Sequence, residues 1–212
     1  MEPIKRITFY YNSLLALFKL SKDYAFLSDA KPVLRLWNLR MMAIKLAKGR
    51  KGLFLEFGVS WGTTINFFAG EISPFVIYGF DSFEGIPDAW NAYEKGSFTL
   101  NGKTPKVKSN VKLVKGWYDK TVRRFVASHN GEKVAFVHID CDVYSSTRTI
   151  FKEIRGLDLD GTYMLFDEFY KYQGWREGEY KAFNEFLKES GYKAEYLAFA
   201  VEGEQVLARL HR

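Results

Sequence analysis

From Gly52 onward, short apolar runs alternate with segments of helical spacing, and this alternation limits the fold more than any other feature of the chain. The apolar runs are near-continuous, as in strands that are buried on both faces of a sheet. Strands that alternate with helices form parallel sheets with helices on both faces. The sequence therefore predicts an α/β fold with a doubly wound, mostly parallel sheet. The predicted strands are 52–59, 75–81, 111–116, 134–140 and 161–168, and the predicted helices are 63–72, 119–129, 145–157 and 177–191.

The end of the chain has a different pattern. Two strand-like runs, KAEYLAFA at 193–200 and EQVLARL at 204–210, flank a short VEG turn. Runs separated by a few residues that include glycine are typical of β-hairpins. We therefore expect the sheet to carry a C-terminal antiparallel hairpin.

Residues 1–50 carry apolar side chains at three- and four-residue spacing, which predicts helices. Pro32 suits the first turn of one of them. We expect residues 1–50 to form a helical extension before a main domain at 51–212, within one globular unit. Apolar residues are too numerous for one solvated helix, so these helices should pack across a ligand site or against a second copy of the chain; a helix on a membrane surface is the alternative. The residues concerned are Leu34, Leu36, Trp37, Leu39, Met41, Met42 and Ile44.

Cysteine content and charge limit the compartment and the partners. The single cysteine, Cys141, cannot form an internal disulfide, which favours a cytoplasmic location. No apolar run reaches the roughly 18 residues of a membrane-spanning helix, and no small-residue cleavage site follows the N-terminal apolar stretch. The net charge of +6 comes from scattered Lys and Arg rather than from a dense basic stripe, so no nucleic-acid partner is expected.

The ends of the first two predicted strands carry a candidate cofactor site. In an open parallel sheet, ligands bind beyond the carboxyl ends of the strands. Gly58 and Gly62, in LEFGVSWGTT, permit a tight turn and a close backbone approach to a ligand. Asp81 follows about 20 residues later, where dinucleotide-binding folds keep an acid for ribose hydroxyls. A solvated loop aspartate is the alternative, but turn and acid together favour a nucleoside-containing cofactor.

The next segments offer less specific signals. The third strand ends in GWYDKTV, where Trp117 or Tyr118 could lie against an adenine ring or in the core. Residues 84–110 are irregular, and loops of this length commonly act as lids or binding loops. We expect this loop, the region after Tyr170 and the N-terminal helices to form the pocket for the second substrate, whose identity the sequence does not encode.

Four carboxylates follow the fourth and fifth predicted strands: Asp140, Asp142, Asp167 and Glu168. If those strands are adjacent, the acids converge. Like charges so close require either a shared proton with a raised pKa or a bound cation. Oxygen ligands alone favour Mg²⁺, Mn²⁺ or Ca²⁺ over zinc. The alternative is that the acids only cap the helices that follow.

Five motifs in register then resemble a known family: LEFGVSWGTT, YGFDSFEGIPDAW, GWYDKTV, HIDCDVYSST and MLFDEFY, within residues 53–190. Together they are similar to the macrocin-type O-methyltransferases, class I enzymes that use S-adenosylmethionine. The resemblance implies a Rossmann-like, seven-stranded methyltransferase fold and methyl transfer to a hydroxyl of a small molecule, either a sugar or a phenolic natural product. It implies that S-adenosylmethionine is bound by Glu56, Gly58, Val59, Ser60, Thr63, Thr64, Asp81, Ser82, Phe83, Gly116, Trp117 and Asp140.

The same resemblance implies a divalent metal, most simply Mg²⁺, held by Asp142, Asp167 and Glu168, with Asp142 as the base that takes the hydroxyl proton. The chain departs from the family at Glu168, where an aspartate is usual. The lysine that catechol methyltransferases carry shortly after the strand-four aspartate is also missing.

Two other functions remain open on the sequence. Asp140-Cys141-Asp142 is an Asp-x-Asp motif, which could bind a nucleotide sugar through a metal in a glycosyltransferase. Glu168 in place of aspartate would also fit a non-catalytic S-adenosylmethionine-binding module. His138 is expected in the core, with a position facing the site as the alternative. Cys141 is expected as an unreactive strand-end residue whose pKa the flanking acids raise.

Overall fold

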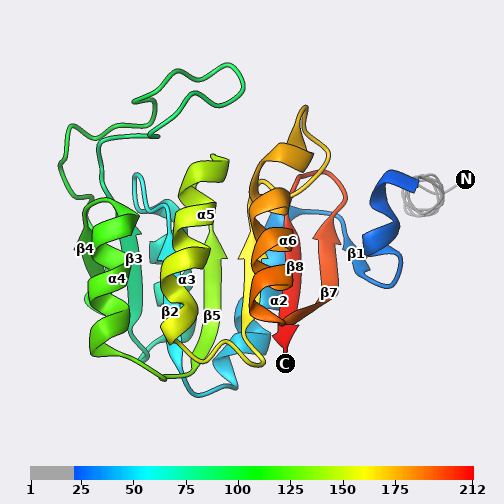
Figure 1. Ribbon diagram of the computed structural model, residues 1–212. Helices are drawn as coiled ribbons and strands as arrows, with labels where there is room; N and C mark the ends of the chain where they lie inside the picture. The colour runs from blue at the N-terminus through cyan, green and yellow to red at the C-terminus, as the bar shows by residue number, and fades with distance from the viewer. Residues whose placement is uncertain (1–21) are drawn as a thin grey trace, which may run out of the picture.

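The computed structural model describes residues 22–212 and contains one sheet of eight strands in the order β1-β7-β8-β6-β5-β2-β3-β4 (Figure 1). The strands are β1 (Lys31–Val33), β2 (Leu53–Phe57), β3 (Ile77–Asp81), β4 (Val111–Lys115), β5 (Val134–Ile139), β6 (Tyr163–Phe166), β7 (Lys193–Ala200) and β8 (Val206–His211). The helices are α2 (Leu36–Lys48), α3 (Thr63–Ile72), α4 (Tyr118–Ser128), α5 (Tyr144–Glu153) and α6 (Glu179–Ser190), with short 3₁₀ turns η1 (Lys22–Leu27), η2 (Ile154–Gly156) and η3 (Trp175–Glu177).

The strand directions confirm the doubly wound, mostly parallel sheet. Neighbouring strands pair in parallel from β4 through β6, and β1 pairs in parallel with β7. Only β8 runs antiparallel, between β6 and β7. The C-terminal hairpin of β7 and β8 is therefore also confirmed.

Helices cover both faces of the sheet, as Figure 1 shows. Helices α4, α5 and α6 pack side by side on one face, where Phe125, Phe151 and Phe183 belong to one apolar cluster. Helices α2 and α3 cover the other face, where Ile44 and Phe68 belong to a second cluster. Because both faces are buried, the central strands β2, β5 and β6 have no exposed residue, which explains their near-continuous apolar sequence.

The N-terminal region is only partly helical within the described residues. Helix α2 packs on the sheet against β5, β6 and β7. Pro32, however, lies in the edge strand β1 and not in a first helical turn. An edge strand tolerates proline because one row of its backbone donors has no partner strand. The remaining part of the predicted helical extension, residues 1–21, lies outside the described residues. Among residues 22–212, no helix has both the length and the apolar character needed to span a membrane.

The chain order reverses between β2 and β5. Strand β2 pairs with β3 on one side and with β5 on the other, so the connections that leave β2 and β5 diverge at their carboxyl ends. A divergence of this kind opens a crevice at the edge of the sheet. The close contact there depends on Gly58, whose φ is +93° and whose added Cβ would lie 1.6 Å from the Asp140 carbonyl oxygen.

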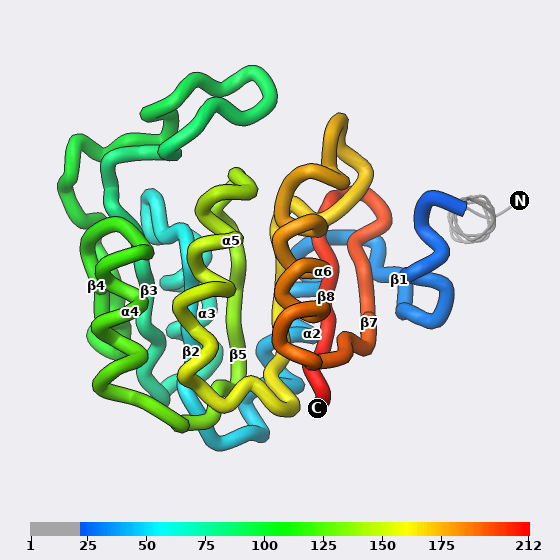
Figure 2. The backbone as a smooth tube through the Cα atoms, in the orientation of Figure 1, coloured from blue at the N-terminus to red at the C-terminus, as the bar shows by residue number. Residues whose placement is uncertain are grey.

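Residues 84–110 contain neither helix nor strand; residues 84–98 extend beyond the carboxyl end of β3 (Figure 2), and the segment then returns to the amino end of β4, where the Ile77 amide donates to the Asn110 carbonyl. We call residues 84–98 the arm. The arm doubles back on itself: the Ile86 amide donates to the Ser97 carbonyl, and Trp90 and Tyr93 exchange backbone hydrogen bonds near its tip. It is anchored to the protein body through Ser145, whose hydroxyl donates to the Asp88 carboxylate.

Candidate active site

The turn after β2 is held in shape by Asp81. One carboxylate oxygen of Asp81 accepts hydrogen bonds from the amides of Val59 (2.9 Å) and Ser60 (2.8 Å). The other accepts from the amide of Phe83 at 2.7 Å. A carboxylate offers about four lone-pair positions, so three backbone bonds leave little capacity for ribose hydroxyls. Asp81 therefore has a structural role that the sequence did not predict.

A pocket lies at this turn and reaches across the ends of β2, β3, β4 and β5. Most of the residues predicted to bind the cofactor line it: Gly58, Val59, Ser60, Thr63, Thr64, Asp81, Ser82, Gly116, Trp117 and Asp140. We call it the cofactor pocket. Exposed aromatic side chains stand at its walls, with Trp61 70% and Trp117 38% exposed.

Two of the predicted cofactor residues do not line this pocket. Phe83 is buried, and its carbonyl accepts backbone bonds from Leu100 and Gly102, so it shapes the base of the arm. Glu56 is fully buried within β2, where its carboxylate lies 3.4 Å from Nδ1 of His138. Burial raises the pKa of Glu56, and the interaction with His138 opposes this effect.

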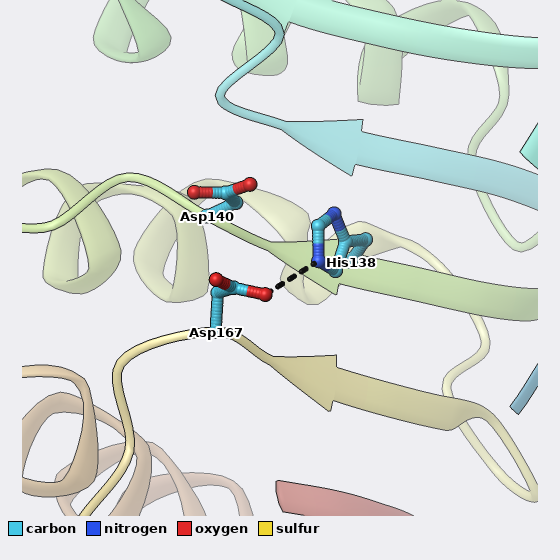
Figure 3. Close-up of side chains that lie close together, drawn as sticks. All are labelled: His138, Asp140 and Asp167. Carbon is cyan, nitrogen blue, oxygen red and sulfur yellow. Dashed lines mark ion pairs between the residues drawn. The ribbon is translucent and has the colours of Figure 1, made fainter. Parts of the chain in front are cut away.

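His138 joins Glu56 to the acids at the strand ends. Its Nε2 lies 3.7 Å from the Asp167 carboxylate (Figure 3). Burial alone would lower the pKa of His138, but the interactions with Asp167 and Glu56 raise it to about 9. Its two ring nitrogens face two carboxylates, an arrangement that favours the charged imidazolium. The expectation of a core histidine is right about burial, and the alternative that His138 faces the site agrees with its position beside Asp167.

Asp167 has a second cation. The guanidinium of Arg40, on α2, donates a hydrogen bond of 3.0 Å to it, and Gln205 donates at 3.4 Å. Burial would raise the pKa of Asp167, but His138 and Arg40 hold it below its usual value. The charge of Asp167 is thus balanced by side chains of the protein itself. Sequence reasoning missed Arg40, since nothing in the helical spacing of α2 marks one arginine as internal.

The other acids at the strand ends form a tight group. Carboxylate oxygens of Asp140, Asp142 and Glu168 lie within 4.8 Å of one another. A second group, within the same distance, joins Asp140 and Asp167 to His138. The prediction placed Asp142, Asp167 and Glu168 together; the structure gathers Asp142 and Glu168 around Asp140 and places Asp167 beside His138.

The carboxylates of the Asp140–Asp142–Glu168 group repel one another in a buried setting. Burial, followed by the charge of Asp167, raises the pKa of Asp140 well above its usual value and that of Asp142 to about 6. Burial and Asp140 raise the pKa of Glu168, whose Oε2 is buried without a hydrogen-bond partner in the described chain. Glu179, the fully buried first residue of α6, accepts from the Glu168 amide at 3.3 Å and adds a fifth carboxylate that the sequence analysis missed.

Cys141 lies between these acids without being reactive. Its side chain is buried and contacts the Thr147 hydroxyl at 3.3 Å. Burial is the main cause of its raised pKa, ahead of the charge of Glu179.

A second pocket adjoins the acids on the side away from the glycine turn. Its walls are the arm at 88–91, the start of α5 at 142–145 and the segment 172–178 between β6 and α6. Asp142, at a left-handed φ of 62°, lines both pockets. We call this second hollow the acceptor pocket. The long loop and the region after Tyr170 both line it, as predicted. Helix α2, from the N-terminal region, does not line it.

A family model described as a methyltransferase domain matches residues 55–169, more than half of the chain. The chain belongs to this methyltransferase family. The match spans the glycine turn, Asp81 and all four acids at the strand ends. It confirms the class suggested by the motifs, and it leaves the glycosyltransferase interpretation of Asp140-Cys141-Asp142 without support. The macrocin-type subfamily stays a prediction.

Solved structures show the same fold. The calicheamicin methyltransferase CalS11 is 22% identical, with a TM-score of 0.66 over 99% of this chain and 93% of that one. The O-methyltransferase NovP is 19% identical, with a TM-score of 0.60 over 84% and 80% of the two chains. An O-methyltransferase from Bacillus cereus in complex with SAH is 12% identical, with a TM-score of 0.54 over 95% and 90%. A comparison with curated proteins gave no match.

Proposed function

We propose that this methyltransferase is an S-adenosylmethionine-dependent O-methyltransferase that acts, with the help of a divalent cation, on a hydroxyl of a small molecule. The observation that carries the proposal is the position of Asp142, which lines both the cofactor pocket and the acceptor pocket. A cofactor in the first pocket and a hydroxyl compound in the second would meet at this carboxylate.

The cofactor pocket fits S-adenosylmethionine. At Gly58 the turn has no room for a side chain, so the backbone itself forms the wall. Trp117 and Trp61 offer flat apolar faces for a nucleobase. The SAH complex of the Bacillus cereus relative supports this choice of cofactor.

The acidic group fits Mg²⁺. Asp140, Asp142 and Glu168 provide oxygen ligands only, and burial, followed by the neighbouring acids, raises their pKa values. Glu168 Oε2 has no hydrogen-bond partner among the described residues. Hard divalent cations prefer such ligands. Asp167 is already neutralised by Arg40 and His138, so its proposed part as a ligand is weaker than the resemblance implied.

S-adenosylmethionine supplies an electrophilic methyl group, and a divalent cation lowers the pKa of a nearby hydroxyl. Asp142 would take the proton that the acceptor hydroxyl loses. The adjoining pockets would hold the hydroxyl oxygen, the methyl carbon and the cofactor sulfur in line. Such positioning accounts for much of the acceleration in two-substrate reactions. Asp81 would keep the glycine turn in its binding conformation.

The domain bounds, the location and the partners of the protein complete the proposal. We assign cofactor binding to residues 51–212 and treat 1–50 as an extension, part of which, β1 and α2, belongs to the same sheet structure. A cytoplasmic location, the lack of a nucleic-acid partner and contact with a second copy or a membrane surface through residues 1–50 stay predictions.

Calorimetric titration with S-adenosylhomocysteine, in parallel with nucleotide sugars, tests the cofactor. A screen of phenols and glycosides with methyl-labelled cofactor then tests the reaction, with and without EDTA. We expect S-adenosylhomocysteine to bind in both conditions and methyl transfer to need the metal. Full activity in excess EDTA would contradict the metal, and binding of nucleotide sugars alone would contradict the methyltransferase proposal.

A further inference from the structure

The acceptor pocket has acidic walls. Among the described residues that line it, Asp88, Asp142 and Glu177 are acidic and none is lysine or arginine. Asp88 comes from the arm, Asp142 follows β5 and Glu177 lies in η3, so negative charge faces the pocket from three sides. The charges of Glu168 and Glu179 reach its Tyr172 wall and raise the pKa of that phenol, after burial.

Two cations act on the Tyr144 wall of this pocket without lining it: Arg148, which is paired with Glu185 and Glu189, and Lys181. Nζ of Lys181, on α6, is 2.7 Å from the Glu177 carboxylate and 5.1 Å from the centre of the Tyr144 ring. Lys181 therefore offsets the negative charge of Glu177. It does not offset the charge of Asp88 or of the acids at the strand ends. A divalent ion would offset charge at Asp140, Asp142 and Glu168 but not at Asp88, so the arm side of the pocket stays negative.

Aromatic rings form the remaining walls. Trp90, near the tip of the arm, lies edge-on to Tyr172 with the ring centres 6.0 Å apart, and Tyr144 also lines the pocket. Trp90 is further stacked on Tyr93, at 5.9 Å and 10°. Aromatic faces bind flat rings and attract cations, whereas no lysine or arginine among these walls would pair with a phosphate.

We propose that the acceptor pocket selects a hydroxyl compound whose ring carries a positive charge, such as an amino sugar, and rejects phosphorylated or nucleotide-linked rings. This inference rests on the proposed function, because the pocket is assigned to the acceptor by its contact with Asp142. The relative CalS11 is described as a TDP-rhamnose 3'-O-methyltransferase, whose substrate carries a diphosphate. On charge, the present pocket is suited to the opposite kind of acceptor.

Three matched probes test the charge preference: methyl glucosaminide, methyl glucoside and the phosphate ester of methyl glucoside. Their dissociation constants are measured by NMR titration at low salt, with Mg²⁺, with and without S-adenosylhomocysteine. We expect the amino glycoside to bind about tenfold more tightly than the neutral one, or ~1.4 kcal/mol, and the phosphate more weakly than either. Equal affinities, a preference for the phosphate or no binding of the amino glycoside would overturn the inference.

Removal of one charge from the arm locates the effect. Asp88→Asn keeps an oxygen that can accept the Ser145 hydrogen bond and should abolish the preference for the amino glycoside. Glu94→Gln makes the same charge change on the arm outside the pocket lining and should keep the preference. Both residues are exposed, so both variants should fold. Loss of the preference in both variants, or in neither, would contradict a site at Asp88. S-adenosylhomocysteine affinity, measured in parallel, tests the proposed function separately, since the probe titrations do not depend on turnover.

Discussion

Arg40, on the N-terminal helix α2, forms a partly buried ion pair of 3.0 Å with Asp167 at the carboxyl end of β6. The two side chains are 21% and 13% exposed. Through this pair, a helix outside the matched family region reaches the acids of the candidate active site. Together with His138, Arg40 makes Asp167 the anionic centre of a buried network.

Replacement of Arg40 tests this relationship. Arg40→Met keeps the apolar stem but leaves Asp167 with one cation fewer, and a lost hydrogen bond to a charged group costs about 1.5–3 kcal/mol. We expect the free energy of unfolding, from urea titration, to fall by roughly that amount. Lys45→Met removes an exposed cation from the same helix and should have little effect. Equal effects of the two substitutions would show that the pair contributes nothing specific.

His138 should make stability depend on pH. Its pKa in the folded protein is about 9 because of Asp167 and Glu56, against about 6.5 in an unfolded chain. A raised pKa of this kind adds stability that is fully present below pH 6.5 and is lost as the pH rises through 9. We expect on the order of 3 kcal/mol from the 2.5-unit shift at 1.36 kcal/mol per unit.

The measurement is urea unfolding of the wild type and of His138→Asn between pH 6 and pH 10. The stability advantage of the wild type should shrink from pH 6.5 upward and be nearly lost above pH 9. His129, at the carboxyl end of α4, provides the control. The substitution His129→Asn also removes an imidazole ring, but at a position away from Asp167 and Glu56. A wild-type advantage that is constant or grows with pH would contradict a buried imidazolium.

The sequence was sufficient to predict the strands, the helices and their alternation. A parallel strand that is buried on both faces has a distinctive apolar run, and a segment with the apolar spacing of a helix lies between one run and the next. It was also sufficient to bring the strand-end acids together, since adjacent parallel strands end at one edge. It failed at Pro32, where three residues of edge strand were read as a helix start: the strand depends on pairing with β7, more than 150 residues away along the chain.

The partners of the site were also beyond sequence reasoning. His138 looks like a core residue in an apolar run, and only the pairing of β2 with β5 places Glu56 opposite it. Arg40 and Glu179 reach the acids from helices whose patterns do not mark an inward charge. Asp81 was recognised by its position, but its bonds to Val59 and Ser60 depend on the conformation of the turn.

The close approach at Gly58 should be highly sensitive to substitution. Gly58→Ala would place Cβ 1.6 Å from the Asp140 carbonyl oxygen, at a φ of +93°. Gly96→Ala, in the arm, has a similar φ of +86° but no atom within 4 Å of the new Cβ. The first variant combines steric overlap with backbone strain, and the second has only the strain, about 1–2 kcal/mol. We expect Gly58→Ala to lower the urea midpoint far more and to abolish S-adenosylhomocysteine binding; similar midpoints would contradict a close contact between β2 and β5.

Asp81 should couple the glycine turn to cofactor affinity. Asp81→Ala removes three backbone hydrogen bonds, so both the free energy of unfolding and S-adenosylhomocysteine affinity should fall, the latter by about tenfold or more. Asp119→Ala, on an exposed part of α4, is the matched control. Reduced affinity at unchanged stability would instead favour direct ribose binding by Asp81, as the sequence suggested.

Asp142 should show opposite effects on stability and on activity. Its pKa of about 6 lies above the 3.8 of an ordinary aspartate because of burial and the charges of Asp167 and Asp81. A carboxylate with a raised pKa destabilises the fold increasingly as the pH rises from 3.8 to 6, and fully above 6. Without metal, Asp142→Asn should therefore be more stable than the wild type at pH 7, by about 3 kcal/mol, and nearly equal to it at pH 4.

With Mg²⁺ present, the order of stability of the two proteins should change. The cation binds the carboxylates of the wild type and so stabilises it, and it binds the amide of Asp142→Asn more weakly. Turnover of Asp142→Asn should fall by about a hundred- to ten-thousandfold, the usual effect of losing a general base. Urea unfolding at the two pH values, with EDTA or Mg²⁺, is compared with turnover on an acceptor from the screen. A variant that is less stable than the wild type in EDTA at pH 7 would show that Asp142 is satisfied by the protein alone. The metal would then have to be held by the other acids, and the proton would need a different acceptor.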